Sequence, residues 1–210
     1  MLNITLLSLS TQEIVGFRKW LGKHSFPTNQ VNFSLIQKSP EQPYQLIGLK
    51  AAEAKARTRI IKFLNLNSQS QDIDVIVAVE NCIFQSKDGN VCESGYVGIY
   101  IKTWDNSISG KILSYQLRLI EIDNEYAKKA HELSNQQKSV TSQQWGVPIG
   151  SVIAMQNPDC NPDDYQGFLT QGQLTRSQQI TESLDGLTDT KSLETNYLVK
   201  HLKFHFNLDC

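Results

Sequence analysis

The stretch Asp72-Ile-Asp-Val-Ile-Val-Ala-Val-Glu-Asn-Cys-Ile-Phe84 is the part of the chain from which the fold is best inferred. Its apolar run, Val75 to Val79, is typical of a strand buried on both faces. Glu80 interrupts this run. A carboxylate at such a position must be hydrated, hydrogen-bonded, paired or metal-bound, because an isolated buried charge is too costly. Two interpretations stay open: Glu80 ends an ordinary strand and reaches solvent or an arginine, or it belongs to a functional site.

Composition allows one globular domain and argues against several classes of protein. The 210 residues fit one large domain or two small ones, and a hydrophobic fraction of 40% is enough for a core. With 20 Lys and Arg against 21 Asp and Glu, nothing indicates an electrostatic nucleic-acid binder. The apolar runs are too short to span a bilayer, and Met1 to Ser10 lacks the features of a signal peptide. We therefore expect no nucleic-acid or membrane partner and a cytoplasmic location.

The cysteines and histidines do not have the spacing of a metal site. Cys82 and Cys92 could pair across a hairpin, although reduced thiols are the expectation in a cytosolic setting. His201 and His205 lie four residues apart on an expected helix, where they could hold a metal. Because no acidic third ligand is near, we interpret them as one face of that helix.

Periodicity and capping signals predict alternating strands and helices. An apolar run precedes Ser10 and Thr11, which can cap a helix with Glu13 in its first turn. Such a helix start can bind an anion, although an acid stands here where a cation would help. The arginines of the helix at 50–64 are interpreted as a solvated face, or alternatively one contacts a ligand. The expected elements, in chain order, are a strand at 3–9, a helix after Ser10, a strand at 31–37, a helix at 50–64, strands at 72–84, 91–104 and 111–122 in an antiparallel meander, a helix at 123–133, a strand at 165–170, and helices at 177–184 and 193–206.

Two polar segments interrupt this order. Asn135 to Pro162 is rich in Gln and Ser and contains three prolines, so we expect a lid-like or partner-binding excursion. Asp185 to Lys191 is expected to be a flexible insertion. We therefore expect residues 1–210 to form a single domain with excursions at 135–162 and 185–191.

Four separated blocks of the sequence resemble the inosine/xanthosine triphosphatase family and the related C-terminal domain of the proline-rich coiled-coil proteins. The last block is the most specific, because a Gly-x-Leu-Thr-Arg turn that enters a helix near the C-terminus is not generic. The blocks are the strand-to-helix start, Pro40-Glu41-Gln42-Pro43 with the helix up to Arg59, Val77-Ala78-Val79-Glu80-Asn81, and Gly167-Phe168-Leu169-Thr170-Gln171-Gly172-Gln173-Leu174-Thr175-Arg176.

The resemblance implies an α/β fold of two lobes, in which helices flank a long twisted mixed sheet around a central cleft. It also implies a homodimer that hydrolyses inosine or xanthosine triphosphate to the monophosphate and pyrophosphate with Mg²⁺. Glu80 matches the family's acidic position, as a metal ligand or as the residue that orients the attacking water. Arg59 matches a basic position of the helix after the proline block. The matching substrate-binding positions are Ser8, Ser10, Gln42, Arg57, Asn81, Thr175 and Arg176.

The sequence departs from the family pattern in the phosphate loop. Family enzymes begin with Thr-Thr-Asn-Pro-x-Lys, whereas the span here is Ser8-Leu9-Ser10-Thr11-Gln12-Glu13, so that Glu13 replaces a phosphate-neutralising lysine. Two further acids of the pattern are missing, near Gln37 and near Ala51. Hydrolysis of a triphosphate needs a metal with carboxylate ligands and cations on the developing charge, which Glu80 alone cannot supply.

The resemblance and the departures leave two main functions. The first is a divergent nucleotide-binding or protein-interaction module with weakened or lost hydrolysis, for which the proline-rich coiled-coil relatives are a precedent. The alternative is an active magnesium-dependent nucleoside triphosphate pyrophosphohydrolase, in which Glu41 or Glu53 acts beside Glu80. A different small-molecule activity in the same cleft is a third interpretation. The departures favour the first function, in which residues 135–144 and 185–191 would offer partner surfaces.

Overall fold

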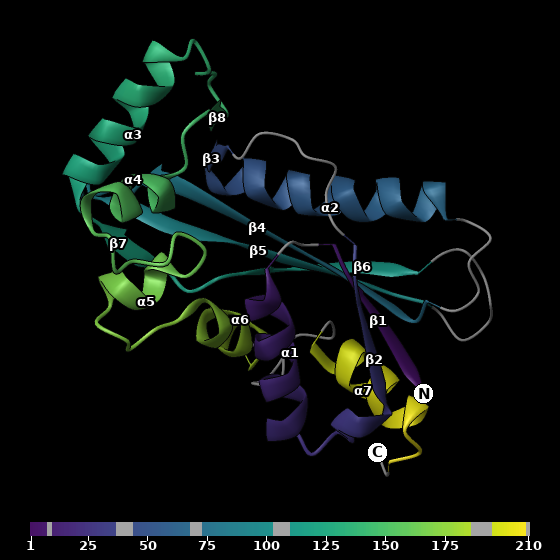
Figure 1. Ribbon diagram of the computed structural model, residues 1–210. Coiled ribbons are helices and arrows are strands. Elements are labelled where there is room, and N and C mark those ends of the chain that lie inside the picture. The colour runs from purple at the N-terminus through teal and green to yellow at the C-terminus, as the bar shows by residue number, and fades with distance from the viewer. Residues whose placement is uncertain (8–9, 37–43, 68–72, 103–109, 186–194, 209–210) are drawn as a thin grey trace.

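The structure is a computed structural model that describes residues 1–7, 10–36, 44–67, 73–102, 110–185 and 195–208. It is an α/β structure in which helices flank a mixed sheet (Figure 1). The elements are, in chain order, β1 (Leu2–Leu6), α1 (Thr11–Lys23), the 3₁₀ turn η1 (Thr28–Gln30), β2 (Val31–Leu35), β3 (Gln45–Ile47), α2 (Leu49–Leu66), β4 (Val75–Gln85), β5 (Val91–Ile101), β6 (Lys111–Gln116), β7 (Ile120–Ile122), α3 (Asn124–Gln136), β8 (Gln144–Trp145), α4 (Ile149–Gln156), α5 (Tyr165–Leu169), α6 (Arg176–Asp185) and α7 (Thr195–His205).

The hairpin of β4 and β5 forms the centre of the sheet. The two strands pair antiparallel over their whole length. The turn between them uses Gly89, whose φ of 88° suits glycine, and the Ser86 N–H donates to the Asn90 carbonyl at 2.8 Å. β1 and β3 run parallel to β4 along its other edge, while β6 and β7 pair antiparallel with β5. β2 extends the sheet parallel to β1, and β8 extends it antiparallel to β3.

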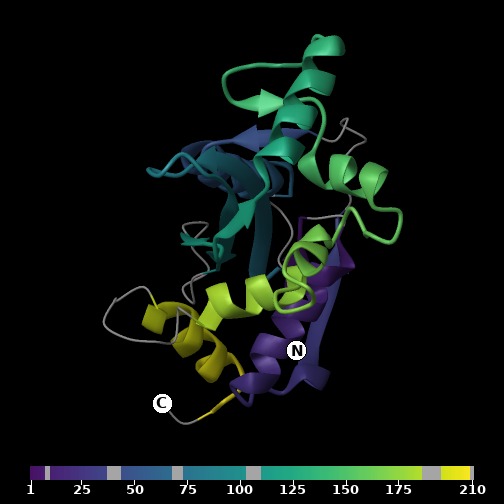
Figure 2. The ribbon, with the colours of Figure 1, turned by 90° about the vertical axis from the view of Figure 1, so that its left-hand side faces the viewer.

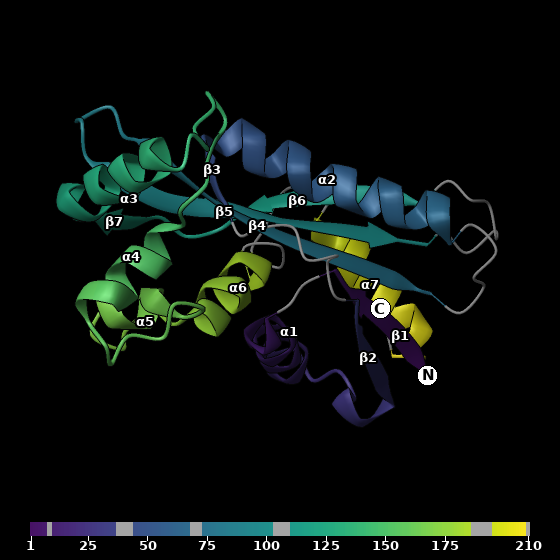
Figure 3. The ribbon, with the colours of Figure 1, turned by 45° about the horizontal axis from the view of Figure 1, so that its top comes forward.

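Helices cover both faces of this sheet. α2 lies along one face, where its Ala56 and Ile60 pack with Ile76 and Ala78 of β4 (Figure 3). α1, α6 and α7 lie on the opposite face and share a larger apolar cluster with β1, β4 and β5 (Figure 1). Because successive side chains of a strand point to opposite faces, the run Val75 to Val79 supplies both clusters. The prediction that this run is buried on both faces is confirmed, since all five residues are buried.

The distal end of the hairpin has its own apolar cluster. Ile83 of β4 and Ile122 of β7 pack there with Ala130 of α3, Ile153 of α4 and Tyr165 of α5. Figure 2 faces this end of the molecule, where α3, α4 and β8 gather. The cluster joins Ile83 to Tyr165, which are 82 residues apart in the sequence, so this end of the hairpin is fixed by tertiary packing.

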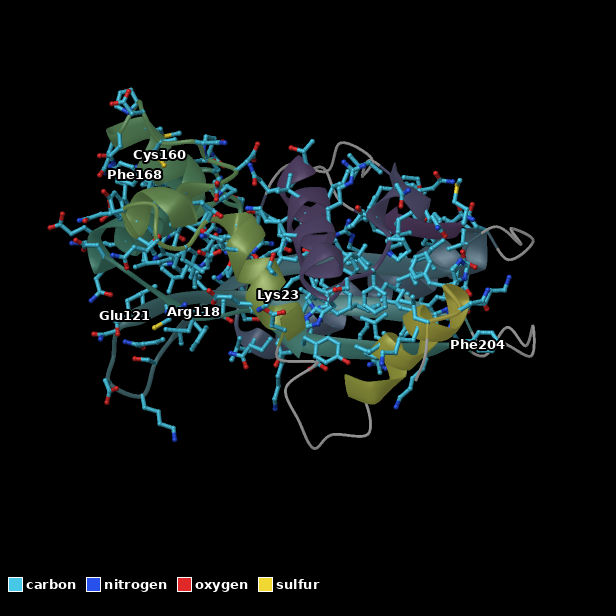
Figure 4. All side chains as sticks on the ribbon, turned by 90° about the horizontal axis from the view of Figure 1, so that it is seen from below. Lys23, Arg118, Glu121, Cys160, Phe168 and Phe204 are labelled. Carbon is cyan, nitrogen blue, oxygen red and sulfur yellow. The ribbon has the colours of Figure 1, made fainter. Side chains whose placement is uncertain are left out.

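Helix α1 packs closely on α6. A Cβ at Gly16 would lie 2.8 Å from the Ser177 carbonyl oxygen, so only glycine permits this approach. The Thr181 hydroxyl donates to the Gly16 carbonyl at 3.0 Å. At the ends of the helices, the Asp185 carboxylate lies 2.5 Å from Lys23 Nζ and 3.0 Å from His24 Nε2 (Figure 4 labels Lys23). Although burial opposes its ionisation, these two hydrogen bonds lower the pKa of Asp185.

Most of the expected elements are confirmed. α1 begins after Ser10, whose hydroxyl accepts the Gln12 N–H at 3.3 Å, and α3 begins after Asp123, whose carboxylate accepts the Glu125 N–H at 2.9 Å. The antiparallel meander is present in β4, β5 and β6. Cys82, Cys92 and Cys160 are free thiols. Among the described residues, no helix combines the length and apolar composition that crossing a bilayer requires.

Two expectations about local structure are wrong, and one segment contains a strand and a helix that its composition did not indicate. Residues 165–170 do not form a strand: 165–169 are helix α5, which is held by tertiary contacts of Gln166 and Tyr165. The excursion at 135–162 contains β8 and α4, because its apolar residues pack into the cluster at the hairpin end. The strand at 111–122 is split into β6 and β7, and the Arg118 carbonyl in the break accepts a hydrogen bond from Gln179 Nε2 of α6 at 2.6 Å. The sequence patterns also missed β3.

Candidate functional site

Glu80 lies inside β4 and forms a buried ion pair with α2. Its side chain is 6% exposed, and its Oε1 lies 2.5 Å from Nη1 of Arg59. The same Nη1 also donates to the Val79 carbonyl at 3.4 Å. A buried carboxylate is tolerated when a cation compensates its charge and donates hydrogen bonds to it. The structure therefore supports the interpretation in which Glu80 pairs with an arginine, although the strand continues for five residues beyond it.

The surroundings of Glu80 do not fit a magnesium ion. Mg²⁺ needs nearly octahedral oxygen ligands, and in proteins it is held by one or two carboxylates with water and phosphate. Here the guanidinium of Arg59 contacts Oε1 of Glu80 and occupies the position in which a metal ion would bind this oxygen. Among the described residues, no group of three or more His, Cys, Asp or Glu side chains could hold a metal ion. Glu80 and its described neighbours therefore do not form a magnesium site.

Glu53 and Tyr96 lie near Glu80 on the α2 face of the sheet. Tyr96 is directly opposite Glu80 in the β4–β5 register, so both side chains point toward α2. The pKa of Tyr96 is raised by burial, with further contributions from Glu53 of α2 and from Cys82. Glu53 is thus on the same face as Glu80, as the hydrolase alternative requires, while Glu41 lies outside the described residues.

The opposite face of the same hairpin carries a second polar group, which we call the Glu93 cluster: Glu93, Tyr165, Gln166 and Arg176. Glu93 is fully buried, and its Oε1 accepts a hydrogen bond from Gln166 Nε2 of α5 at 2.9 Å. Burial raises the pKa of Glu93, while Arg176, Gln166 and Tyr165 act in the opposite direction. The pKa of Tyr165 is raised well above its usual value by burial and by Glu93. The cluster therefore holds a carboxyl group whose neutral form is favoured by the fold.

Two buried amide oxygens in and beside the Glu93 cluster lack a donor among the described residues. They are Oε1 of Gln166 and Oδ1 of Asn81. Asn81 and Glu93 are diagonal neighbours on one face of the β4–β5 ladder, since Ile83 pairs with Glu93 and Asn81 pairs with Gly95. Burying an acceptor without a donor is costly, so binding of a hydrogen-bond donor at these oxygens would be favourable.

The turn that enters α6 is organised by its own hydrogen bonds. The Thr175 N–H donates to Gln178 Oε1 at 2.6 Å, and the Gln178 N–H donates to the Thr175 hydroxyl at 3.3 Å. This reciprocal pair is a capping box. The Arg176 N–H donates to Asp164 Oδ1 at 2.6 Å, and Gly172 adopts a left-handed φ of 81°. Thr175 thus caps a helix, and Arg176 is directed inward.

The sequence-predicted site residues are divided by the sheet. Glu80 faces α2, whereas Asn81 and Arg176 lie on the opposite face, so alternation along β4 separates Glu80 from Asn81. Arg176 is 5% exposed and donates to Gln179 Oε1 at 3.2 Å. Arg57 is exposed on α2, and Ser10 caps α1. Ser8 and Gln42 lie outside the described residues.

The start of α1 is unfavourable for phosphate. Glu13 stands in its first turn and is 4% exposed. A carboxylate there is stabilised by the positive end of the helix dipole and occupies the electrostatic position that an anionic ligand would use. Lys19 of α1 contacts the first turn of α6, where its Nζ donates to the Ser177 hydroxyl at 3.4 Å.

Sequence reasoning missed the residues that complete both polar groups. Glu93 is not among the positions that the resemblance names, although an acid between Cys92 and Ser94 in an otherwise apolar and small strand is a usable signal. Gln166 lies in a segment whose pattern predicts a strand, and it gives no local signal of a site. Arg59 was matched to a basic position, but its pairing with Glu80 could not be predicted, since it depends on how α2 docks on the sheet.

Comparison with known proteins supports the fold alone. No protein-family model matches the chain, and no curated protein sequence matches it. The structure is similar to the crystal structure of protein VC0702 from Vibrio cholerae, with a TM-score of 0.58 and 13% sequence identity over 90% of this chain and 96% of that chain. At this identity the likeness concerns the arrangement of helices and strands. The chain is thus an α/β protein with the overall fold of VC0702.

Proposed function

We propose that this chain is a divergent inosine/xanthosine triphosphatase-like protein of two lobes, which acts as a nucleotide-binding or protein-interaction module with weakened or lost hydrolysis. The observation that carries the proposal is the 2.5 Å ion pair between Glu80 and Arg59. A catalytic carboxylate must be available to a metal or to water, whereas Glu80 is engaged in its ion pair with Arg59 inside the fold.

The other charges named by the resemblance support the same proposal. Hydrolysis of a triphosphate requires cations at the charge that develops on the phosphoryl oxygens. Arg176 is buried beside Glu93, Arg59 is engaged by Glu80, and Glu13 places a negative charge at the start of α1. Two of the arginines that the resemblance names, Arg59 and Arg176, thus lie beside carboxylates of the protein itself, while Arg57 is exposed on α2.

The decisive experiment measures hydrolysis and binding separately. The wild type and Glu80→Gln are incubated with inosine, xanthosine, adenosine and guanosine triphosphates in the presence of Mg²⁺ or Mn²⁺, and pyrophosphate release is followed. We expect pyrophosphate release that is absent or slow and that is equal in both proteins. Release that is lost in Glu80→Gln would instead establish the alternative, an active pyrophosphohydrolase.

Binding is measured by the thermal shift of the same two proteins with each triphosphate and with inosine monophosphate. A saturable rise in melting temperature supports the nucleotide-binding form of the proposal. If no nucleotide shifts the melting temperature, the protein-interaction form is left, and chemical cross-linking with mass spectrometry in cells identifies its partner. If no nucleotide shifts the melting temperature and no partner is recovered, the proposed function is wrong. Light scattering tests the homodimer that the resemblance implies.

A further inference from the structure

A pocket of about 410 Å³ lies at the distal end of the β4–β5 hairpin, between β3, β8 and α3. Figure 2 faces this end of the molecule. The volume is in the range of small-molecule sites. The apolar wall of the pocket is formed by Ile47, Ile83, Val91 and Trp145. Its polar rim is formed by Gln85, Asn124, Lys128 and His131.

The walls of this pocket, which we call the Trp145 pocket, are held in place before any ligand arrives. The ring of His131 lies against the indole of Trp145, with 4.9 Å between the ring centroids. Oδ1 of Asn124 accepts the Val91 N–H at 3.2 Å, and Gln85 Nε2 donates to the Gly89 carbonyl at 3.1 Å. These contacts tie α3 and β8 to the hairpin, and a pre-formed site loses less entropy on binding.

The ionisable side chains at the rim of the Trp145 pocket are basic. Lys128 and His131 are the titratable residues among the described residues that line the pocket, and none of these lining residues carries a carboxylate. Glu121 and Asp123 line a neighbouring depression that shares Asn124 with the pocket. A negative group is therefore attracted toward Lys128 and repelled from the Asn124 side. An apolar body would meet Ile47, Ile83 and the indole of Trp145.

We propose that the Trp145 pocket binds a small amphipathic anion, with an apolar and preferably aromatic body against Trp145 and one carboxylate, sulfonate or phosphate group at Lys128. This site is separate from Glu80 and from the Glu93 cluster, and the proposal does not depend on the function proposed above. Aromatic stacking and area burial supply affinity, while Lys128 selects for charge.

The test uses 1-naphthoate as the probe and the neutral 1-naphthamide as its matched control. The indole N–H signals of the tryptophans are followed by NMR during titration, with the Trp145 signal assigned through Trp145→Phe. We expect a saturable displacement of the Trp145 signal by 1-naphthoate, and an affinity for 1-naphthamide that is about tenfold lower.

Two charge reversals on α3 make the test specific. Lys128→Glu removes the selecting charge and is expected to weaken 1-naphthoate binding about tenfold or more. Lys129 is also exposed on α3 but does not line the pocket. The Lys129→Glu variant is therefore expected to bind 1-naphthoate with an affinity within about twofold of wild type. Both side chains are exposed, so both variants fold.

Three outcomes would overturn the proposal. The first is no saturable displacement of the Trp145 signal at millimolar 1-naphthoate. The second is equal affinity for 1-naphthoate and 1-naphthamide. The third is equal weakening by Lys128→Glu and Lys129→Glu, which would show general electrostatic attraction and no site at Lys128.

Discussion

At the scale of single residues, the two faces of the β4–β5 hairpin each bury one carboxyl group in different surroundings. Glu80 is paired with Arg59 at 2.5 Å, while Glu93 is fully buried with its pKa raised. Each acid depends on one arginine from a helix packed on its own face. Removing either arginine therefore exposes the cost of a buried carboxylate, and the two substitutions should differ in their pH dependence.

Arg59→Met is expected to lower the free energy of unfolding by about 3 kcal/mol at neutral pH, because it leaves Glu80 buried and uncompensated. Urea denaturation measures the change. The matched control is Arg57→Met, an exposed arginine on the same helix, whose effect should stay within about 0.5 kcal/mol. Equal losses in the two variants would mean that the Glu80–Arg59 pair contributes nothing to stability.

Arg176→Met is expected to destabilise the protein more at pH 8 than at pH 4. The raised pKa of Glu93 means that the folded state favours its protonated form, so stability falls as the pH rises through that pKa. Arg176 opposes the shift by attracting the ionised form, an effect that exists only at high pH. Urea denaturation at both pH values tests this, with Arg57→Met as the control, and a loss independent of pH would contradict it.

At the scale of elements, the contact between α1 and α6 depends on the absence of a side chain. A Cβ at Gly16 would meet the Ser177 carbonyl oxygen at 2.8 Å and Ile180 Cβ at 3.0 Å. A backbone oxygen cannot rotate away as a flexible side chain can, so α6 itself would have to shift. Since α6 begins at Arg176, this contact also helps to position the Glu93 cluster.

Gly16→Ala and Gly22→Ala form a matched pair on α1. Gly16→Ala is expected to cost about 1–3 kcal/mol, because it pushes α6 away. Gly22→Ala meets nothing within 4 Å and is expected to stabilise the protein by about 0.5 kcal/mol through helix propensity. Thermal unfolding followed by circular dichroism measures both. The account of the helix contact would be wrong if Gly16→Ala were as stable as Gly22→Ala.

At the scale of the whole molecule, Cys82 reports on opening of the sheet. Its thiol is fully buried in β4, and burial together with Glu93 raises the pKa of Cys82 to about 12. A thiol reacts as the thiolate, so reaction requires exposure to water. Labelling of Cys82 should therefore follow global unfolding, which must separate β4 from β5.

Pulse alkylation with iodoacetamide across a urea titration, read peptide by peptide in a mass spectrometer, measures this exposure. We expect the labelling midpoint of Cys82 to coincide with the midpoint of unfolding by circular dichroism. Cys160, 5% exposed near α5, serves as the internal comparison and is expected to label at lower urea. Rapid labelling of Cys82 without urea would show that the hairpin opens locally.

Most of the fold could be predicted from local signals, and most of the candidate site could not. The run Val75 to Val79, the cap Ser10 and the turn at Gly89 each encode their structure within a few residues. By contrast, 165–169 is a helix because of contacts made by its side chains with distant segments. The alternating pattern of a strand could have warned that Glu80 and Asn81 face opposite ways.

The sequence by itself determined the order of most helices and strands, the buried hairpin strand and the presence of an acid within it. Only the tertiary structure decided what surrounds that acid: Glu80 meets Arg59 across 21 residues, and Glu93 meets Gln166 across 73. Helix and strand signals are local because backbone conformation and hydrogen bonding repeat over a few residues. The partner of a buried charge depends instead on sheet register and on helix docking, which are set by the packing of the whole molecule.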